Sequence, residues 1–140
     1  MQKNIYNQKI TILNKLKRTD SLTGSDVWYK QVIQDAAWYK RSERTVQGSS
    51  VLIGTYVNVL IPFHTDYLPY TEWKLAGNPD DYFTMSVGDY IILGDVEDTI
   101  TPNNITQVIQ KYSGMYCLVK HITENYNRFG AKIQLSIEGV

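Results

Sequence analysis

Apolar and polar residues alternate along much of this chain, and a period of two is typical of a β-strand with one face in solvent. The alternation is clearest at residues 131–139, where Ile133, Leu135 and Ile137 share one face and polar side chains share the other. Similar runs predict strands at residues 9–16, 26–33, 36–43, 51–61, 86–93, 115–121 and 131–139. Many short strands separated by turn residues predict an all-β fold, a small β-barrel or a partly open sandwich.

Two of these runs predict an aromatic hairpin. Residues 26–33 and 36–43 are separated only by Gln34-Asp35, a length that fits a two-residue hairpin loop. The hairpin would bring together the Trp-Tyr-Lys triplets at 28–30 and 38–40. Each cross-strand aromatic pair would then add about 0.2–1 kcal/mol of stability.

The run at residues 51–61 is apolar on both faces, which predicts a central strand. Gly54 within it predicts a bulge or bend. Pro62 is expected to end the strand, because it cannot donate to a strand ladder.

Two long loops interrupt the strands, at residues 64–81 and 94–104. Within the first, residues 70–75 are expected to form one helical turn that is capped by Thr71 and anchored by Trp73. Long ordered loops often carry function, so both are candidate contact surfaces.

Residues 105–112 have apolar positions at helical spacing, and a short helix or a further strand both fit them. We expect one domain over residues 1–140, since this length supports a hydrophobic core.

The formal net charge is zero, but the charges are segregated. Residues 1–50 carry nine Lys/Arg and four Asp/Glu, residues 51–105 carry one and eight, and residues 106–140 carry four and two. Such a chain can dock onto copies of itself or between unlike partners; the alternative is that the acidic loops are only solvated.

Cys117 is the single cysteine, so the chain has no internal disulfide, and we expect a small buried apolar side chain in a protein of the reducing cytoplasm. The polar start of the chain predicts no secretion signal. The longest apolar run, residues 57–63, is too short to cross a membrane.

Residues with catalytic or metal-binding chemistry do not form a recognisable set. His64 and His121 lack further ligands at zinc spacing. Asp95, Glu97 and Asp98 lack the alternation and central glycine of a calcium loop. We therefore predict no metal, no cofactor and no enzymatic activity.

Basic residues accompany aromatic ones at 15–18 and 40–44, a combination that can bind single-stranded nucleic acid by phosphate contact and stacking. Zero net charge favours a solvated basic edge that prevents unwanted strand pairing. Nucleic-acid binding stays open as an alternative, and so does a glycan-binding module that uses exposed Trp and Tyr.

The C-terminal half resembles the head-closure and head–tail joining proteins of tailed bacteriophages. The resemblance is carried by MSVGDYII at 85–92, MYCLV at 115–119 and RFGAKIQLSIEG at 128–139. The front half is similar to small proteins from structural modules of phages and prophages of Firmicutes, through the aromatic segment at 27–39 and the strand at 51–63 that ends in Ile-Pro-Phe.

This resemblance implies a structural virion protein, made in the host cytoplasm and placed in the neck, with no membrane contact. Its partners would be copies of itself in a ring of about twelve or about six subunits. Portal or adaptor proteins would lie on one side and tail-tube or terminator proteins on the other, with DNA passing through without sequence-specific binding. A tail terminator or another tail component is an alternative. The candidate interface residues are His64, Asp66, Tyr67, Tyr70, Trp73, Asp95, Glu97, Asp98, Lys40, Arg41 and Arg44.

Overall fold

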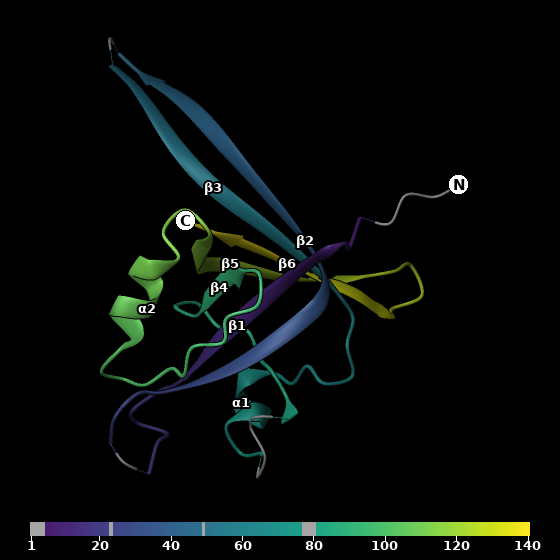
Figure 1. Cartoon of the computed structure of the whole chain (residues 1–140). Helices are drawn as coiled ribbons and strands as arrows, with labels where there is room; N and C mark the ends of the chain where they lie inside the picture. The colour runs from purple at the N-terminus through teal and green to yellow at the C-terminus, as the bar shows by residue number, and fades with distance from the viewer. Residues whose placement is uncertain (1–4, 23, 49, 77–80) are drawn as a thin grey trace.

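Six strands close into an antiparallel barrel in the order β1-β2-β3-β6-β5-β4 (Figure 1). The computed structural model describes residues 5–22, 24–48, 50–76 and 81–140, without the side chains of 43–45, 47, 50–54 and 132. The small all-β barrel predicted from the sequence is confirmed. The strands are β1 (Gln8–Leu16), β2 (Val27–Gln47), β3 (Ser50–Pro62), β4 (Tyr90–Leu93), β5 (Tyr116–Tyr126) and β6 (Lys132–Gly139), and the helices are α1 (Tyr70–Trp73) and α2 (Ile105–Lys111).

The hairpin predicted around Gln34-Asp35 is wrong, because β2 runs unbroken for 21 residues. Its first half pairs with β1 and its second half with β3. The register to β1 slips by one between the pairs Ile10↔Ile33 and Gln8↔Ala36, so Gln34-Asp35 lies in a bulge rather than a turn. A bulge bends and twists a strand, which lets β2 leave β1 and continue alongside β3.

The chain reverses instead between Gln47 and Ser50, which pair with each other across a two-residue loop. Gly48 has φ +60°, the left-handed conformation that the favoured two-residue hairpin turns require and that glycine adopts without strain. Gln34-Asp35 offers no glycine for such a turn.

The two Trp-Tyr-Lys triplets therefore do not face each other. They lie ten residues apart on one strand, a separation of about 33 Å. Trp28 packs against Tyr90 at a ring distance of 5.6 Å, and Trp38 packs against the barrel core.

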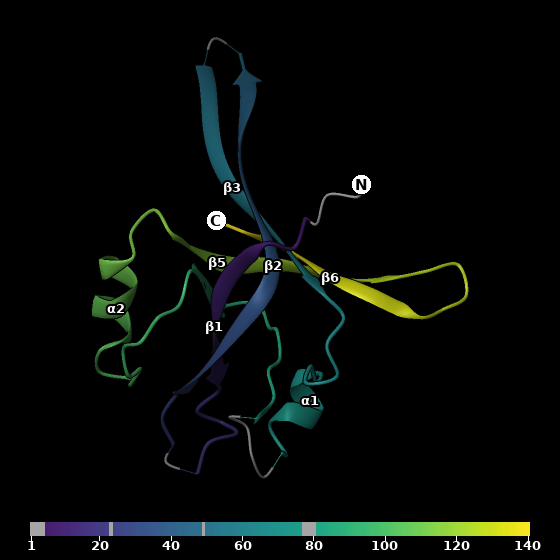
Figure 2. The same cartoon turned by 45° about the vertical axis from the view of Figure 1, so that its right-hand side comes forward.

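A ribbon of two strands extends beyond the barrel. The β3–β6 ladder begins at Val57, and the β1–β2 ladder stops at Ala36, so the only strand ladder described for residues 40–56 is the β2–β3 pairing. Both views show this ribbon pointing away from the rest of the molecule (Figures 1 and 2). We call residues 40–56 the arm.

The core fills the barrel with side chains from every strand. Ile10, Ile12, Val59, Ile61 and Ile91 are among its fully buried members. Each comes from one face of its strand, as the period-two pattern requires.

A second apolar cluster lies under α2, where Val108 and Ile109 pack near Leu13, Ile92 and Val96. Residues 105–111 are thus a helix, and the strand alternative for this segment is wrong. The helix covers the outer face of β1 and β4 (Figure 1).

Three expectations for individual residues have clear outcomes. Cys117 is buried, as predicted, and Pro62 ends β3. Gly54 makes no bulge, because the β2–β3 register is continuous through its pair with Glu43. Strand β3 is flanked by β2 and β6, as expected for a central strand.

The face predicted for β6 is right for Leu135 and Ile137, which are 3% and 1% exposed, but Ile133 is 48% exposed. The β3–β6 ladder ends at the pair Pro62↔Gln134, so Ile133 lies at the very end of the barrel wall, where its carbonyl accepts the Phe63 N–H at 3.0 Å.

Helix α1 is the helical turn expected near Trp73 and starts at Tyr70, but its N-cap residue is Pro69 and not Thr71. Proline fits a helix N-terminus because its fixed φ suits the first turn and its missing N–H costs nothing there. Among the described residues, neither helix has the length and apolar character needed to cross a membrane.

Candidate interaction surfaces

The loop after β3 is tied to the barrel by its aromatic residues. Trp73 is fully buried, its ring meets Tyr29 edge-on at 5.5 Å, and its indole N–H donates to the Tyr82 carbonyl at 3.3 Å. Almost no Trp73 surface is therefore available to a partner, and its role in this chain is to hold α1 in place.

Tyr70 links α1 to the segment after β1. Its hydroxyl donates to Asp20 Oδ2 at 2.6 Å and accepts the Lys17 backbone N–H at 3.2 Å. This hydrogen bond lowers the pKa of Asp20, and burial is the main cause that raises the pKa of Tyr70. The ammonium groups of Lys17 and Lys74 lie over the ring at 5.1 and 5.9 Å.

Tyr67 joins the same loop to β5. Its ring packs against Phe83 at 5.6 Å and its hydroxyl donates to Glu124 Oε1 at 3.3 Å. Burial, followed by the nearby Glu124 charge, raises the pKa of Tyr67 to about 12. His64 lies 3.0 Å from Asp35 Oδ1, but the contact is not aligned as a hydrogen bond.

Asp66 is exposed, and its backbone carbonyl accepts the Phe83 N–H at 3.0 Å. Of the five candidates in this loop, it therefore offers the most accessible charge.

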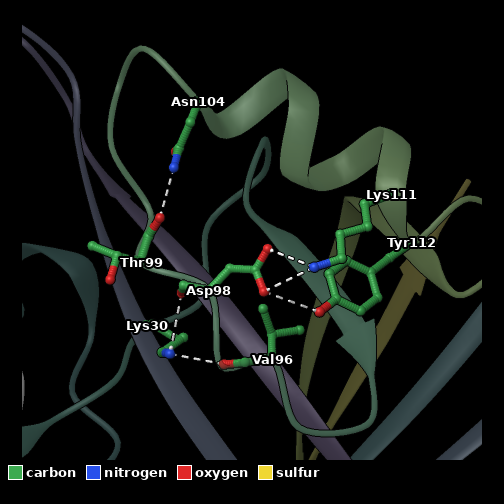
Figure 3. Close-up of polar contacts among 7 residues, drawn as sticks. All are labelled: Lys30, Val96, Asp98, Thr99, Asn104, Lys111 and Tyr112. Atoms are coloured by element: carbon green, nitrogen blue, oxygen red, sulfur yellow. Dashed lines mark hydrogen bonds and ion pairs between the residues drawn. The ribbon is translucent and has the colours of Figure 1, made fainter.

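The loop after β4 is fixed from inside by Val96, which is 1% exposed. The Val96 N–H donates to Thr11 Oγ1 at 3.0 Å, and Lys30 Nζ donates to the carbonyls of Val96 and Asp98 at 2.7 and 3.2 Å (Figure 3). These bonds come from β1 and β2, so the barrel itself sets the shape of the loop.

The three acidic candidates of this loop differ in their surroundings. Asp98 accepts hydrogen bonds from Lys111 at 3.2 and 3.3 Å and from the Tyr112 hydroxyl at 3.4 Å, so it is committed to α2 (Figure 3). Asp95 and Glu97 are exposed on either side of buried Val96, and neither has a side-chain partner among the described residues. We call Asp95 and Glu97 the acidic pair.

The arm holds the three basic candidates. Arg41 contacts Glu138 of β6 at 3.7 Å and lies over the Tyr56 ring at 5.8 Å, so it braces the base of the arm. Lys40 is exposed at the rim of a hollow of about 210 Å³ that Tyr116 and Val140 also line. Arg44 lies further out on β2, where its backbone pairs with Ile53.

One buried polar group was missed by the sequence reasoning. Asp89, 1% exposed, accepts hydrogen bonds from Asn14 Nδ2 at 3.0 Å and from the N–H groups of Lys15 and Ser86 at 3.1 and 3.0 Å. Asn14 also exchanges hydrogen bonds with the Thr84 backbone. Burial raises the pKa of Asp89 to about 6. An asparagine on an otherwise apolar strand face was the available signal.

The described residues include no group of three or more His, Cys, Asp or Glu side chains placed to hold a metal ion. The surfaces above consist of a projecting ribbon, a fixed acidic pair and a braced aromatic loop.

A protein-family model matches residues 5–140, nearly the whole chain, and is described as a family of unknown function, DUF6751. The chain belongs to this family. No curated protein and no solved structure matches the DUF6751 chain.

Proposed function

We propose that this DUF6751 protein is a structural subunit of the neck of a tailed phage or prophage-derived particle, where a ring of copies joins the portal complex to the tail. The observation that carries the proposal is the arm, a strand ribbon that extends beyond a closed barrel (Figures 1 and 2). A projecting element that reaches the next subunit makes a heterologous contact, and such contacts form a ring when the rotation between subunits closes.

Two further features support a contact role. The acidic pair is held outward by a loop fixed to β1 and β2. The sequence resemblance to head-closure proteins is carried by the C-terminal half of the chain, and the front half resembles small proteins of phage structural modules. A tail terminator would use the same ring architecture at the tail side of the junction, and the experiment below separates the two positions.

The test is electron cryo-microscopy of particles from the strain that encodes the chain, compared with particles made when its gene carries a stop codon. We expect density for the barrel between portal and tail tube, and filled heads without tails in the stop-codon lysate. Density at the tail-side end of the junction would move the chain to the terminator position. Particles that join normally without the protein would refute a neck role.

A further inference from the structure

A free two-stranded ribbon is only marginally stable in water, because it has one hydrogen-bonded ladder and no sheet face to bury. The arm is such a ribbon beyond the pair Lys40↔Val57. Its tip is also apolar in sequence, with Val46 67% exposed and Val51-Leu52-Ile53 on the returning strand. An exposed apolar ribbon with open edges is a template for pairing with another chain.

The charge of the arm indicates which kind of chain would bind to it. Residues 40–56 contain Lys40, Arg41 and Arg44 but only one acidic residue, Glu43. Lys40 is exposed at the base and Arg44 lies further out at the same position of the strand period. The arm therefore carries an excess of positive charge in its sequence.

The complementary charge lies elsewhere on the same molecule. Asp95 and Glu97 are exposed and unpaired among the described residues, whereas the neighbouring Asp98 is neutralised by Lys111. The only ion pair described for the arm goes to Glu138 of β6, from Arg41. No ion pair described in the structure joins the arm to the acidic pair within one chain.

We propose that the arm of one copy docks on the acidic pair of a second copy, with Lys40 and Arg44 facing Asp95 and Glu97. The two surfaces differ, so the contact is heterologous and each subunit offers both halves of it. The acidic pair needs no ordering on binding, because the Val96 and Lys30 contacts already fix its loop (Figure 3). This inference deepens the proposed function and rests on it only for the setting in which the copies meet.

The experiment measures self-association of the purified full chain by sedimentation at low and high salt. We expect self-association to be detectable at protein concentrations of up to about 1 mM. The association should weaken as added salt screens the charges. The arm variant Lys40→Glu/Arg44→Glu and the loop variant Asp95→Lys/Glu97→Lys should each raise the dissociation constant at least about tenfold, because like charges then meet.

The decisive measurement is whether association returns when the charges of the two surfaces are exchanged. An equimolar mixture of the arm variant and the loop variant again pairs opposite charges and should associate like the wild type. The variant Arg18→Glu/Lys120→Glu reverses two exposed charges outside both surfaces and serves as the matched control. Circular dichroism confirms that each variant is folded.

A second variant tests the arm without changing the acidic pair. Replacing residues 43–54 by Asn-Gly joins Ser42 to Thr55, which already face each other in the β2–β3 register. This shortened chain should keep its thermal midpoint, because the core residues Val57 and Val59 are untouched, and should sediment as a monomer.

The inference is overturned if the wild type is monomeric at every concentration, if the mixture fails to restore association, or if the shortened chain associates normally. Any of these results leaves the neck location to be decided by microscopy. Conversely, absence from the neck together with charge-reversible association would remove the proposed function and keep the arm contact.

Discussion

The buried Asp89 carboxylate makes a quantitative prediction about stability and pH. Its ordinary pKa is 3.8, and burial raises the value in the folded protein to about 6. Three donors partly oppose this: Asn14 Nδ2 and the N–H groups of Lys15 and Ser86 all point at the carboxylate. Desolvation outweighs them, because the group lies 1% exposed under β1.

The direction follows from proton binding. Between pH 4 and pH 6 the folded protein holds a proton on Asp89 that the unfolded chain has released. The free energy of unfolding therefore falls as the pH rises through this window and levels off above about pH 6. A shift of about two pH units at 1.36 kcal/mol per unit gives a loss of about 3 kcal/mol.

The assay is urea unfolding followed by tryptophan fluorescence at several values from pH 4 to pH 7.5, for the wild type and Asp89→Asn. The asparagine cannot ionise, so its stability relative to the wild type should rise by about 3 kcal/mol across the window. A constant cost of about 1–3 kcal/mol is superimposed, because an amide N–H₂ replaces one of the accepting oxygens. Asp95→Asn, which removes an exposed carboxylate, is the control. A difference between wild type and Asp89→Asn that does not change with pH would refute the reasoning.

Two further substitutions test the packing. Trp73→Ala removes a fully buried ring, its edge contact with Tyr29 and its bond to the Tyr82 carbonyl, and should cost about 3–5 kcal/mol in urea unfolding; a loss below about 1 kcal/mol would show that α1 is not anchored this way. Gly139→Ala places a methyl group 2.8 Å from Cys117 Sγ and from the Leu118 carbonyl, and should cost about 1–3 kcal/mol by calorimetry, whereas an unchanged thermal midpoint would mean that β5 and β6 yield there.

The strands were predictable wherever the period-two pattern reflected a single wet face, as in β6 at Leu135 and Ile137. The pattern failed at Gln34-Asp35, since polar residues between two apolar runs occur both in turns and in bulges. The structure distinguishes a turn from a bulge at Gln34-Asp35, because the chain reverses at Gly48, which has a positive φ. Ile133 was misplaced because alternation identifies a face and not where the barrel wall ends.

The candidate surfaces were predictable as segments but not as individual side chains. Sequence alone treats Asp95, Glu97 and Asp98 alike, and only the position of α2 shows that Asp98 is paired with Lys111. Aromatic residues are frequent at contact surfaces, which makes Trp73 a candidate from the sequence, but the loop after β3 buries its side chain completely. The burial of Asp89 cannot be predicted from the sequence, because two of its three donors, Asn14 and Lys15, come from β1, about 75 residues earlier in the chain.

The continuous strand β2 has a consequence for the order in which the chain folds. The arm pairs residues close in sequence, starting with Gln47 and Ser50, whereas the ladder that closes the barrel joins Leu13 to Tyr90. Closing a loop of about 77 residues rather than about 3 costs roughly 3 kcal/mol more chain entropy. The ribbon that projects from the finished molecule is thus the part most easily nucleated. Because the arm shares strand β2 with the barrel, its formation aligns the first half of β2 as a template for β1. The β1–β4 and β3–β6 ladders form last.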